Sequence, residues 1–186
     1  MDLLKLKEKL QKQFSKIQKK QLSQPTCFIG FDGFTDDIIK VVNKKLAHSK
    51  NYISTIKLFG KKIQEASNKS CNFELIVQQT KIGGNAPILT NALLEGGHSI
   101  VFAGAIGIKN KIEPLFLPMS SRCKKVFALG ASGKTEALEF DDGKIILGKM
   151  ESLNAITYEN MIEQIGLSSL INLLDESDLL VCTNWT

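Results

Sequence analysis

The chain has 186 residues, 43% of them hydrophobic and 23% charged, with a formal net charge of +5. These values are typical of a single soluble globular domain with a sizeable core. No apolar run reaches the roughly 18 residues of a membrane span. No apolar segment follows the charged N-terminus as it would in a signal peptide. We therefore expect a cytoplasmic protein without a membrane partner.

The excess positive charge lies in the first predicted element, a basic amphipathic helix over residues 1–22. Residues 1–20 hold seven lysines and two acidic residues, whereas the rest of the chain has 17 basic and 17 acidic side chains. Apolar residues recur every three or four positions, which predicts a narrow stripe docked on the body or on a partner. An arm for nucleic acid or an acidic partner is the alternative. Without interleaved aromatic residues or arginines, nucleic acid is not expected to bind.

From residue 23 to residue 186, short apolar strands alternate with helical patterns, which predicts an α/β domain with a mostly parallel sheet. The predicted core strands are Thr26–Gly30, Phe73–Gln78, Ser99–Ala103 and Asp178–Thr183. Helical periodicity covers residues 52–66, 88–95, 158–165 and 167–174. A buried parallel strand normally has neighbours on both sides, so we expect a sheet that is incomplete at the C-terminus.

Two stretches interrupt the alternation and predict a small second sheet, or lid. They are the β-branched residues near 37–43 and the strands within 124–148, with Asp141-Asp142-Gly143 as a hairpin turn. The sequence GASGKT at 130–135 is similar to a nucleotide-binding P-loop. However, Ala128 stands where such a loop has its first glycine, and a strand pattern follows it, so we predict a turn between lid strands.

Metal binding is not predicted. Cys27, Cys71, Cys123 and Cys182 have no paired spacing and no histidine at ligand spacing. We expect four free cysteines, with Cys27 and Cys182 in apolar strands where a thiol behaves as a small hydrophobic group.

The sequence Gly83-Gly84-Asn85 joins a strand pattern to a helix pattern and is the most informative local feature. Adjacent glycines allow a ligand to approach the main chain, and the Asn85 amide both donates and accepts hydrogen bonds. The unpaired N–H groups of the following helix point to the same place. This predicts a cradle for a hydroxyl-bearing small molecule. A simple tight turn is the alternative.

Asp32 and Asp36 follow the first predicted core strand, at the sheet edge where open α/β proteins bind ligands. Carboxylates accept strongly from sugar hydroxyls, and two of them four residues apart are able to bind vicinal hydroxyls. An Asx-turn at Asp32 and a solvated charge at Asp36 are the alternatives. Asp37, next in the chain, could exchange roles with Asp36.

Three segments together resemble the N-terminal half of a ribokinase-like carbohydrate kinase of the phosphofructokinase-B type. They are CFIGFDGFTD at 27–36, GGNAPILTNA at 83–92 and VFAGAIG at 101–107, and their order and spacing match the family from residue 26 onward. The resemblance implies a three-layer α/β sandwich with a β-sheet lid over a sugar site. It also implies transfer of the ATP γ-phosphate to a sugar hydroxyl.

The family's first-strand aspartate corresponds to Asp36 or to Asp32, and its glycine pair to Gly83 and Gly84. The substrate-binding residues that the resemblance implies are Asp32, Asp36, Gly83, Gly84, Asn85 and Asn184. ATP and Mg²⁺ are the implied cofactors of the intact enzyme, with the metal neutralising phosphate charge. The lid sheet is a surface through which a homodimer could form.

One family motif is missing. The Gly-Ala-Gly-Asp sequence, whose N–H groups and aspartate serve phosphoryl transfer in the family, does not occur in the 186 residues. We therefore expect the catalytic aspartate beyond residue 186. This chain alone is expected to be inactive and to bind neither ATP nor Mg²⁺ strongly. A non-catalytic sugar-binding or regulatory module is the alternative.

Overall fold

A four-stranded parallel sheet forms the centre of the computed structural model, which describes residues 8, 24–46, 49–109 and 111–184. The strand order is β11–β1–β5–β8, with every neighbouring pair parallel. The strands are β1 (Thr26–Phe31), β5 (Ser99–Gly104), β8 (Lys125–Ala128) and β11 (Leu179–Thr183). β1 and β5 are apolar along almost their whole length because both of their faces are covered.

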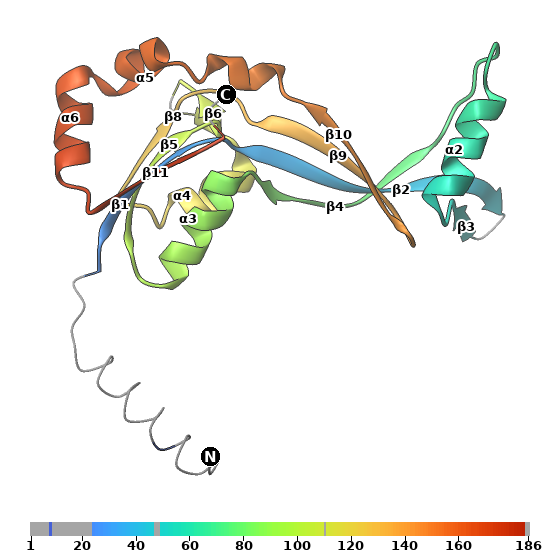
Figure 1. Cartoon of the computed structure of the whole chain (residues 1–186), viewed down its shortest axis with the longest axis horizontal. Helices are drawn as coiled ribbons and strands as arrows, with labels where there is room; N and C mark the ends of the chain where they lie inside the picture. The colour runs from blue at the N-terminus through green and yellow to red at the C-terminus, as the bar shows by residue number, and fades with distance from the viewer. Residues whose placement is uncertain (1–7, 9–23, 47–48, 110, 185–186) are drawn as a thin grey trace.

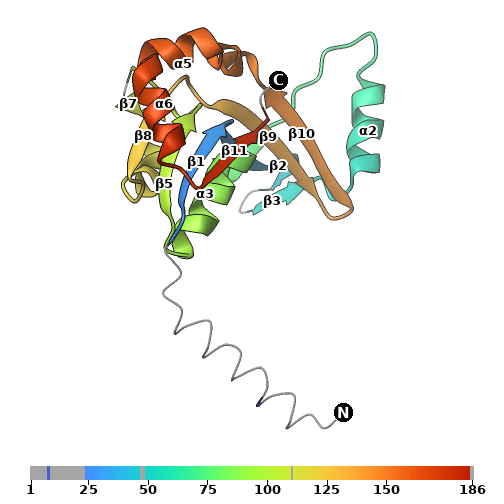
Figure 2. The same cartoon turned by 60° about the vertical axis from the view of Figure 1, so that its left-hand side comes forward.

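Helices cover both faces of this core sheet, so that three layers result (Figures 1 and 2). One face packs against α3 (Asn85–Glu95) and α4 (Leu117–Ser120), the other against α5 (Tyr158–Ile165) and α6 (Leu167–Asp175). Successive side chains of β1 alternate between the two clusters, as the pleat of a strand requires. Ile29 belongs to the α3 side and Phe28 to the α5 side.

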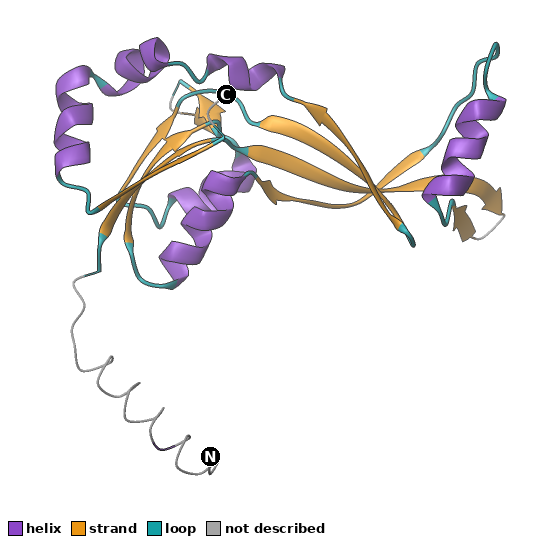
Figure 3. Ribbon diagram, viewed as in Figure 1, coloured by secondary structure: helices purple, strands orange, loops and turns teal. Residues whose placement is uncertain are grey.

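A second, outer sheet extends away from the core sheet (Figures 1 and 3). Its strand order is β10–β9–β2–β3, and β4 also pairs with β2. The strands are β2 (Phe34–Leu46), β3 (Ser49–Tyr52), β4 (Leu75–Gly83), β9 (Gly133–Phe140) and β10 (Gly143–Lys149). The helix α2 (Ile56–Glu65) packs against one face of the sheet, where Phe59 contacts the rings of Phe73 and Phe140.

Short elements complete the chain. They are the two-stranded ribbon of β6 (Gly107–Ile108) and β7 (Lys111–Ile112) and the 3-10 turns η1 (Pro114–Phe116) and η2 (Glu151–Ala155).

The predicted α/β architecture with a second sheet is confirmed, but two strand assignments were wrong. The strand expected at Phe73–Gln78 in the core sheet is β4, which lies in the outer sheet. The first strand of the predicted lid interval 124–148 is β8, which lies in the core sheet, so that only β9 and β10 belong to the outer one. The strand at Asp178–Thr183 does join the core sheet, but at its edge, with Leu180 exposed rather than buried.

The basic helix predicted over residues 1–22 lies, apart from Glu8, outside the described residues. None of the helices in the described part of the chain has the length and apolar character needed to cross a membrane.

Candidate functional site

A buried aspartate, Asp32, holds the start of α3 against the ends of two core strands. Only 2% of Asp32 is exposed. Its Oδ2 accepts from the backbone N–H of Asn85 at 2.7 Å, and its Oδ1 from that of Ala86 at 2.8 Å. The Thr183 hydroxyl donates to Oδ1 and the Asn184 amide to Oδ2, both at 2.9 Å. Four donors use the acceptor positions that a carboxylate offers.

The sequence explains why Asp32 takes this place. The N-cap position of α3 is Gly84, which has no side chain to accept from the first N–H groups of the helix. A carboxylate from the β1–β2 junction supplies the acceptor and also neutralises the positive end of the helix dipole. Gly84 has φ +88°, and a Cβ there would lie 3.0 Å from Oδ2 of Asp32. Glycine is therefore required at residue 84 both by conformation and by space.

The second carboxylate of the site, Asp36, lies against Gly83. On β2, Asp36 pairs in register with Lys81 of β4 and Thr135 of β9. A Cβ at Gly83 would lie 2.5 Å from Cγ of Asp36, so only glycine leaves room for the carboxylate in this position. Asp36 is half-buried, and none of the described residues hydrogen-bonds to its side chain. Its oxygens are thus free to accept from a ligand.

The structure brings together all six residues that the sequence analysis singled out. The two glycines separate the two carboxylates, the exposed Asn85 starts α3 beside them, and Asn184 contacts Asp32 from the end of β11. We call this group, Asp32, Asp36, Gly83, Gly84, Asn85 and Asn184, the cradle. The Asn85 side chain forms no hydrogen bond with the described residues, so it too is available to a ligand.

Asp37 does not exchange roles with Asp36. Because side chains alternate along a strand, Asp37 points to the opposite face of β2 from Asp36. There it accepts a hydrogen bond from Thr80, its partner in register on β4. The alternative left open for Asp37 was therefore wrong.

Sequence reasoning missed Thr183, whose hydroxyl lies 2.9 Å from Asp32 Oδ1 and 3.1 Å from the carbonyl oxygen of Gly30. The signal was present, because Thr183 ends a predicted strand directly before Asn184. Parallel strands bring their carboxyl ends to the same edge of a sheet, so both residues could have been placed beside Asp32.

The turn at 130–135 is no P-loop. β9 begins at Gly133, so a strand follows the glycines and no helix N-terminus faces a phosphate there. Within the described residues, no three His, Cys, Asp or Glu side chains gather where a metal ion could be held.

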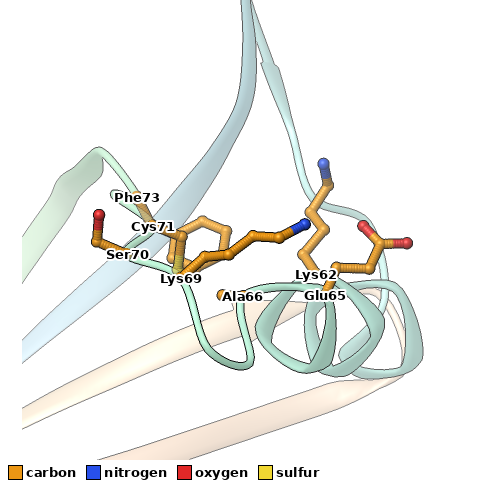
Figure 4. A pocket seen from close by; sticks show the side chains of 7 residues that line it. All are labelled: Lys62, Glu65, Ala66, Lys69, Ser70, Cys71 and Phe73. Atoms are coloured by element: carbon orange, nitrogen blue, oxygen red, sulfur yellow. The ribbon is translucent and has the colours of Figure 1, made fainter.

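Two of the cavities formed by the described residues lie away from the cradle. One, of about 240 Å³, lies between the end of α2 and the segment before β4 (Figure 4). It is lined by Lys62, Glu65, Ala66, Lys69, Ser70, Cys71 and Phe73. The other, of about 220 Å³, is bordered by the β6–β7 ribbon, Glu113, Pro114 and Ala131. Neither cavity includes a cradle residue.

The cysteines are all free, and two of them are shielded. Burial, with a smaller effect of the nearby Asp178 carboxylate, raises the pKa of the Cys27 thiol. Burial also raises the pKa of Cys123, to about 11, against the opposing charge of Arg122. Neither thiol is a nucleophile near neutral pH, because the thiolate is the reactive form. Cys182, expected to be packed in a strand, is instead exposed.

The parallel core sheet, the outer sheet and the cradle between them are the arrangement expected for a ribokinase-like carbohydrate kinase, and comparison with known proteins confirms this class. The model of the prokaryotic ketohexokinase family matches residues 7–186. The chain therefore belongs to that family.

Among individual relatives, the ketohexokinase of Haloferax volcanii is 26% identical over 160 residues, which are 84% of this chain and 42% of that protein. The chain thus spans less than half the length of this curated relative. The crystal structure of Sa239 superposes with a TM-score of 0.53 at 12% identity, over 86% of this chain and 46% of that one. The ribokinase of Giardia lamblia gives a TM-score of 0.47 at 14% identity, over 86% of this chain and 42% of that one.

Proposed function

We propose that the cradle binds a ketohexose and that the complete protein is an ATP-dependent kinase that phosphorylates a hydroxyl group of this sugar. The observation that carries the proposal is the Asp36 carboxylate, which Gly83 admits to the cradle and which no described residue hydrogen-bonds. Membership of the prokaryotic ketohexokinase family, and a relative named ketohexokinase, support the sugar class.

The two aspartates have different roles in this proposal. Asp32 already accepts four hydrogen bonds from the protein, so it positions the cradle instead of binding the sugar. Asp36 accepts from sugar hydroxyls, and each such charge-assisted bond contributes roughly 1.5–3 kcal/mol. The Asn85 amide donates and accepts beside it. Gly83 and Gly84 leave room for the two carboxylates beside them, and Asn184 holds Asp32 in place.

Phosphoryl transfer requires residues other than these. We propose that the catalytic aspartate and the sites for ATP and Mg²⁺ belong to a part of the protein beyond these 186 residues, and that this chain alone does not turn over ATP. The length of the Haloferax volcanii relative, of which the chain spans 42%, supports this. Sugar-dependent release of ADP by the purified chain would contradict it.

The sugar site is tested by thermal denaturation with D-fructose, D-ribose and D-glucose. A ligand that binds only the folded state at 100 times its Kd stabilises that state by about 2.7 kcal/mol, which raises the melting temperature. We expect D-fructose to raise the Tm of the wild-type chain and of Asp37→Asn. Asp36→Asn should keep the Tm of the free protein but lose the increase with sugar.

Asp37→Asn is the matched control because it makes the same chemical change one residue further along β2, on the opposite face. If Asp36→Asn responds to D-fructose as the wild type does, the cradle is not the sugar site. If none of the three sugars shifts the Tm of the wild type, the sugar-binding proposal itself fails.

A homodimer through the outer sheet is a further part of the proposal. Its edge strands β4 and β10 expose the apolar side chains of Leu75, Val77, Ile146 and Leu147. Apolar surface on an unpaired edge favours association with another copy. Light scattering over a range of protein concentrations should show a dimer, and Val77→Lys should shift it to the monomer.

A further inference from the structure

Beside the cradle, a chain of three polar side chains connects the outer sheet to the core. The Glu113 carboxylate, just before η1, accepts a hydrogen bond from the backbone N–H of Ser132 at 2.8 Å and another from the Ser132 hydroxyl at 2.7 Å. The Ser132 Oγ also lies 3.1 Å from Oγ1 of Thr35 on β2. Because Ser132 gives its proton to the carboxylate, Thr35 is the donor to Ser132. A run of hydrogen bonds aligned in this way strengthens each of its members.

The turn that carries Ser132 is held on its other sides as well. Ser152 donates its hydroxyl to the Ser132 carbonyl at 2.9 Å, and the backbone N–H of Gly133 donates to the carbonyl of Gly33 at 2.9 Å. Ser132 itself is only 4% exposed. The start of β9 is therefore fixed relative to both the β1–β2 junction and η2.

The hydrogen bond between Ser132 and Thr35 lies one residue along the chain from Asp36, the carboxylate that is proposed to bind the sugar. Thr35 directly precedes Asp36, and β2 and β9 pair in register from Phe34 with Gly133 through Asp36 with Thr135. Thr35 points to the face opposite Asp36 because side chains alternate along a strand. Glu113 and Ser132 thus fix the face of β2 that carries Thr35, and the opposite face carries Asp36, which belongs to the cradle.

We infer that Glu113 is a positioning residue: through Ser132 and Thr35 it fixes the segment where β2 and β9 begin, and so the place of the Asp36 carboxylate against Gly83. This rests on the proposed function insofar as Asp36 contacts the sugar. Without Glu113, the Ser132 N–H and hydroxyl lose their acceptor. The paired first residues of β2 and β9 then become more mobile, and the Asp36 side chain moves away from its position in the cradle. The sugar then loses affinity although no residue that touches it has changed.

The first test measures D-fructose affinity by calorimetry with the full 186-residue chain. We expect Glu113→Ala to weaken binding at least tenfold and Ser132→Ala about threefold to tenfold. The matched pair Thr35→Val and Thr35→Ser removes and retains the hydroxyl. Thr35→Ser should keep wild-type affinity and Thr35→Val should lose it, a rescue that a purely packing role for Thr35 would not give. Folded Glu113→Ala with affinity within twofold of the wild type would overturn the inference.

The second test needs no ligand. Amide hydrogen exchange in Glu113→Ala should accelerate at least tenfold over residues 34–39 and 133–138, while exchange in β1 and β5 stays at the wild-type rate. Unchanged exchange in β2 and β9, or equal acceleration in all four strands, would overturn the inference. Should the wild type fail to bind D-fructose, the proposed function fails, whereas the exchange experiment still decides on the positioning role.

Discussion

The substitution Asp32→Asn changes one atom type at the centre of the cradle and is expected to destabilise the fold. An amide has only one acceptor oxygen, and its NH₂ group must face one of the two pairs of donors that Asp32 now accepts from. The Thr183 hydroxyl and the Asn184 amide are able to turn and accept. The backbone N–H groups of Asn85, part-buried, and Ala86, buried, are not, so one of them loses its acceptor.

The magnitude follows from two effects. A buried donor left without an acceptor costs about 1–3 kcal/mol, and loss of the negative charge at the N-terminus of α3 costs about 0.3–1 kcal/mol or somewhat more when buried. We therefore expect a loss of roughly 3 kcal/mol in the free energy of unfolding. For a chain of this size, that corresponds to a fall in Tm of about 6–12 °C.

The assay is urea denaturation followed by circular dichroism, in the absence of sugar. The midpoint should fall while the slope m is unchanged, because the surface exposed on unfolding stays the same. Asp37→Asn is the control, with a loss under about 1 kcal/mol, since Asp37 is half-buried and accepts from Thr80 alone. A loss below about 0.5 kcal/mol for Asp32→Asn, within the range of ordinary surface changes, would refute the reasoning.

Three further predictions concern glycines and cysteines. Gly84→Ala should destabilise the fold by about 1–3 kcal/mol because φ is positive there. Gly60→Ala, in α2 with no atom within 4 Å of its added Cβ, should instead stabilise the fold by about 0.5–1 kcal/mol. Urea midpoints measure both changes, and equal effects would contradict the account of residue 84. In the native protein at pH 8, Ellman's reagent should modify the exposed Cys71 and Cys182 quickly and Cys27 and Cys123 slowly; four equal rates would argue against the shielding. Burial raises the pKa of Cys123 from its ordinary value of 9.0 to about 11 in the folded protein. The stability that this shift contributes is therefore fully present below pH 9.0 and is lost as the pH rises toward about 11. Cys123→Ala should therefore lose less stability between pH 8 and pH 10 than the wild type, as measured by urea midpoints at the two pH values.

The sequence was sufficient to predict the layers of the fold because both of its main signals are local. Apolar strands such as Thr26–Phe31 and helices with one apolar face alternate along the chain, and this order allows few arrangements. It did not reveal the sheet to which Leu75–Gly83 belongs. That strand mixes apolar and polar residues without clear alternation, and its partner β2 lies more than 30 positions earlier.

The cradle residues were also predictable, since a glycine pair before a helix and acidic residues after a strand are short-range patterns. Their separate roles were not. Whether Asp32 or Asp36 remains free for a ligand depends on donors at Thr183 and Asn184, about 150 residues away in the chain. The cluster of Glu113, Ser132 and Thr35 was missed for the same reason, because its members come from three separate segments.

The contacts between Asp32 and β11 have a consequence for how the protein folds. The two side-chain donors at 183 and 184 reach Asp32 across separations of 151 and 152 residues in a chain of 186. Closing so long a loop is slow compared with forming the hairpin of β9 and β10. The ligand-binding region is therefore expected to mature last, when nearly all of these residues have left the ribosome. A chain released early would contain the outer sheet but an incomplete cradle.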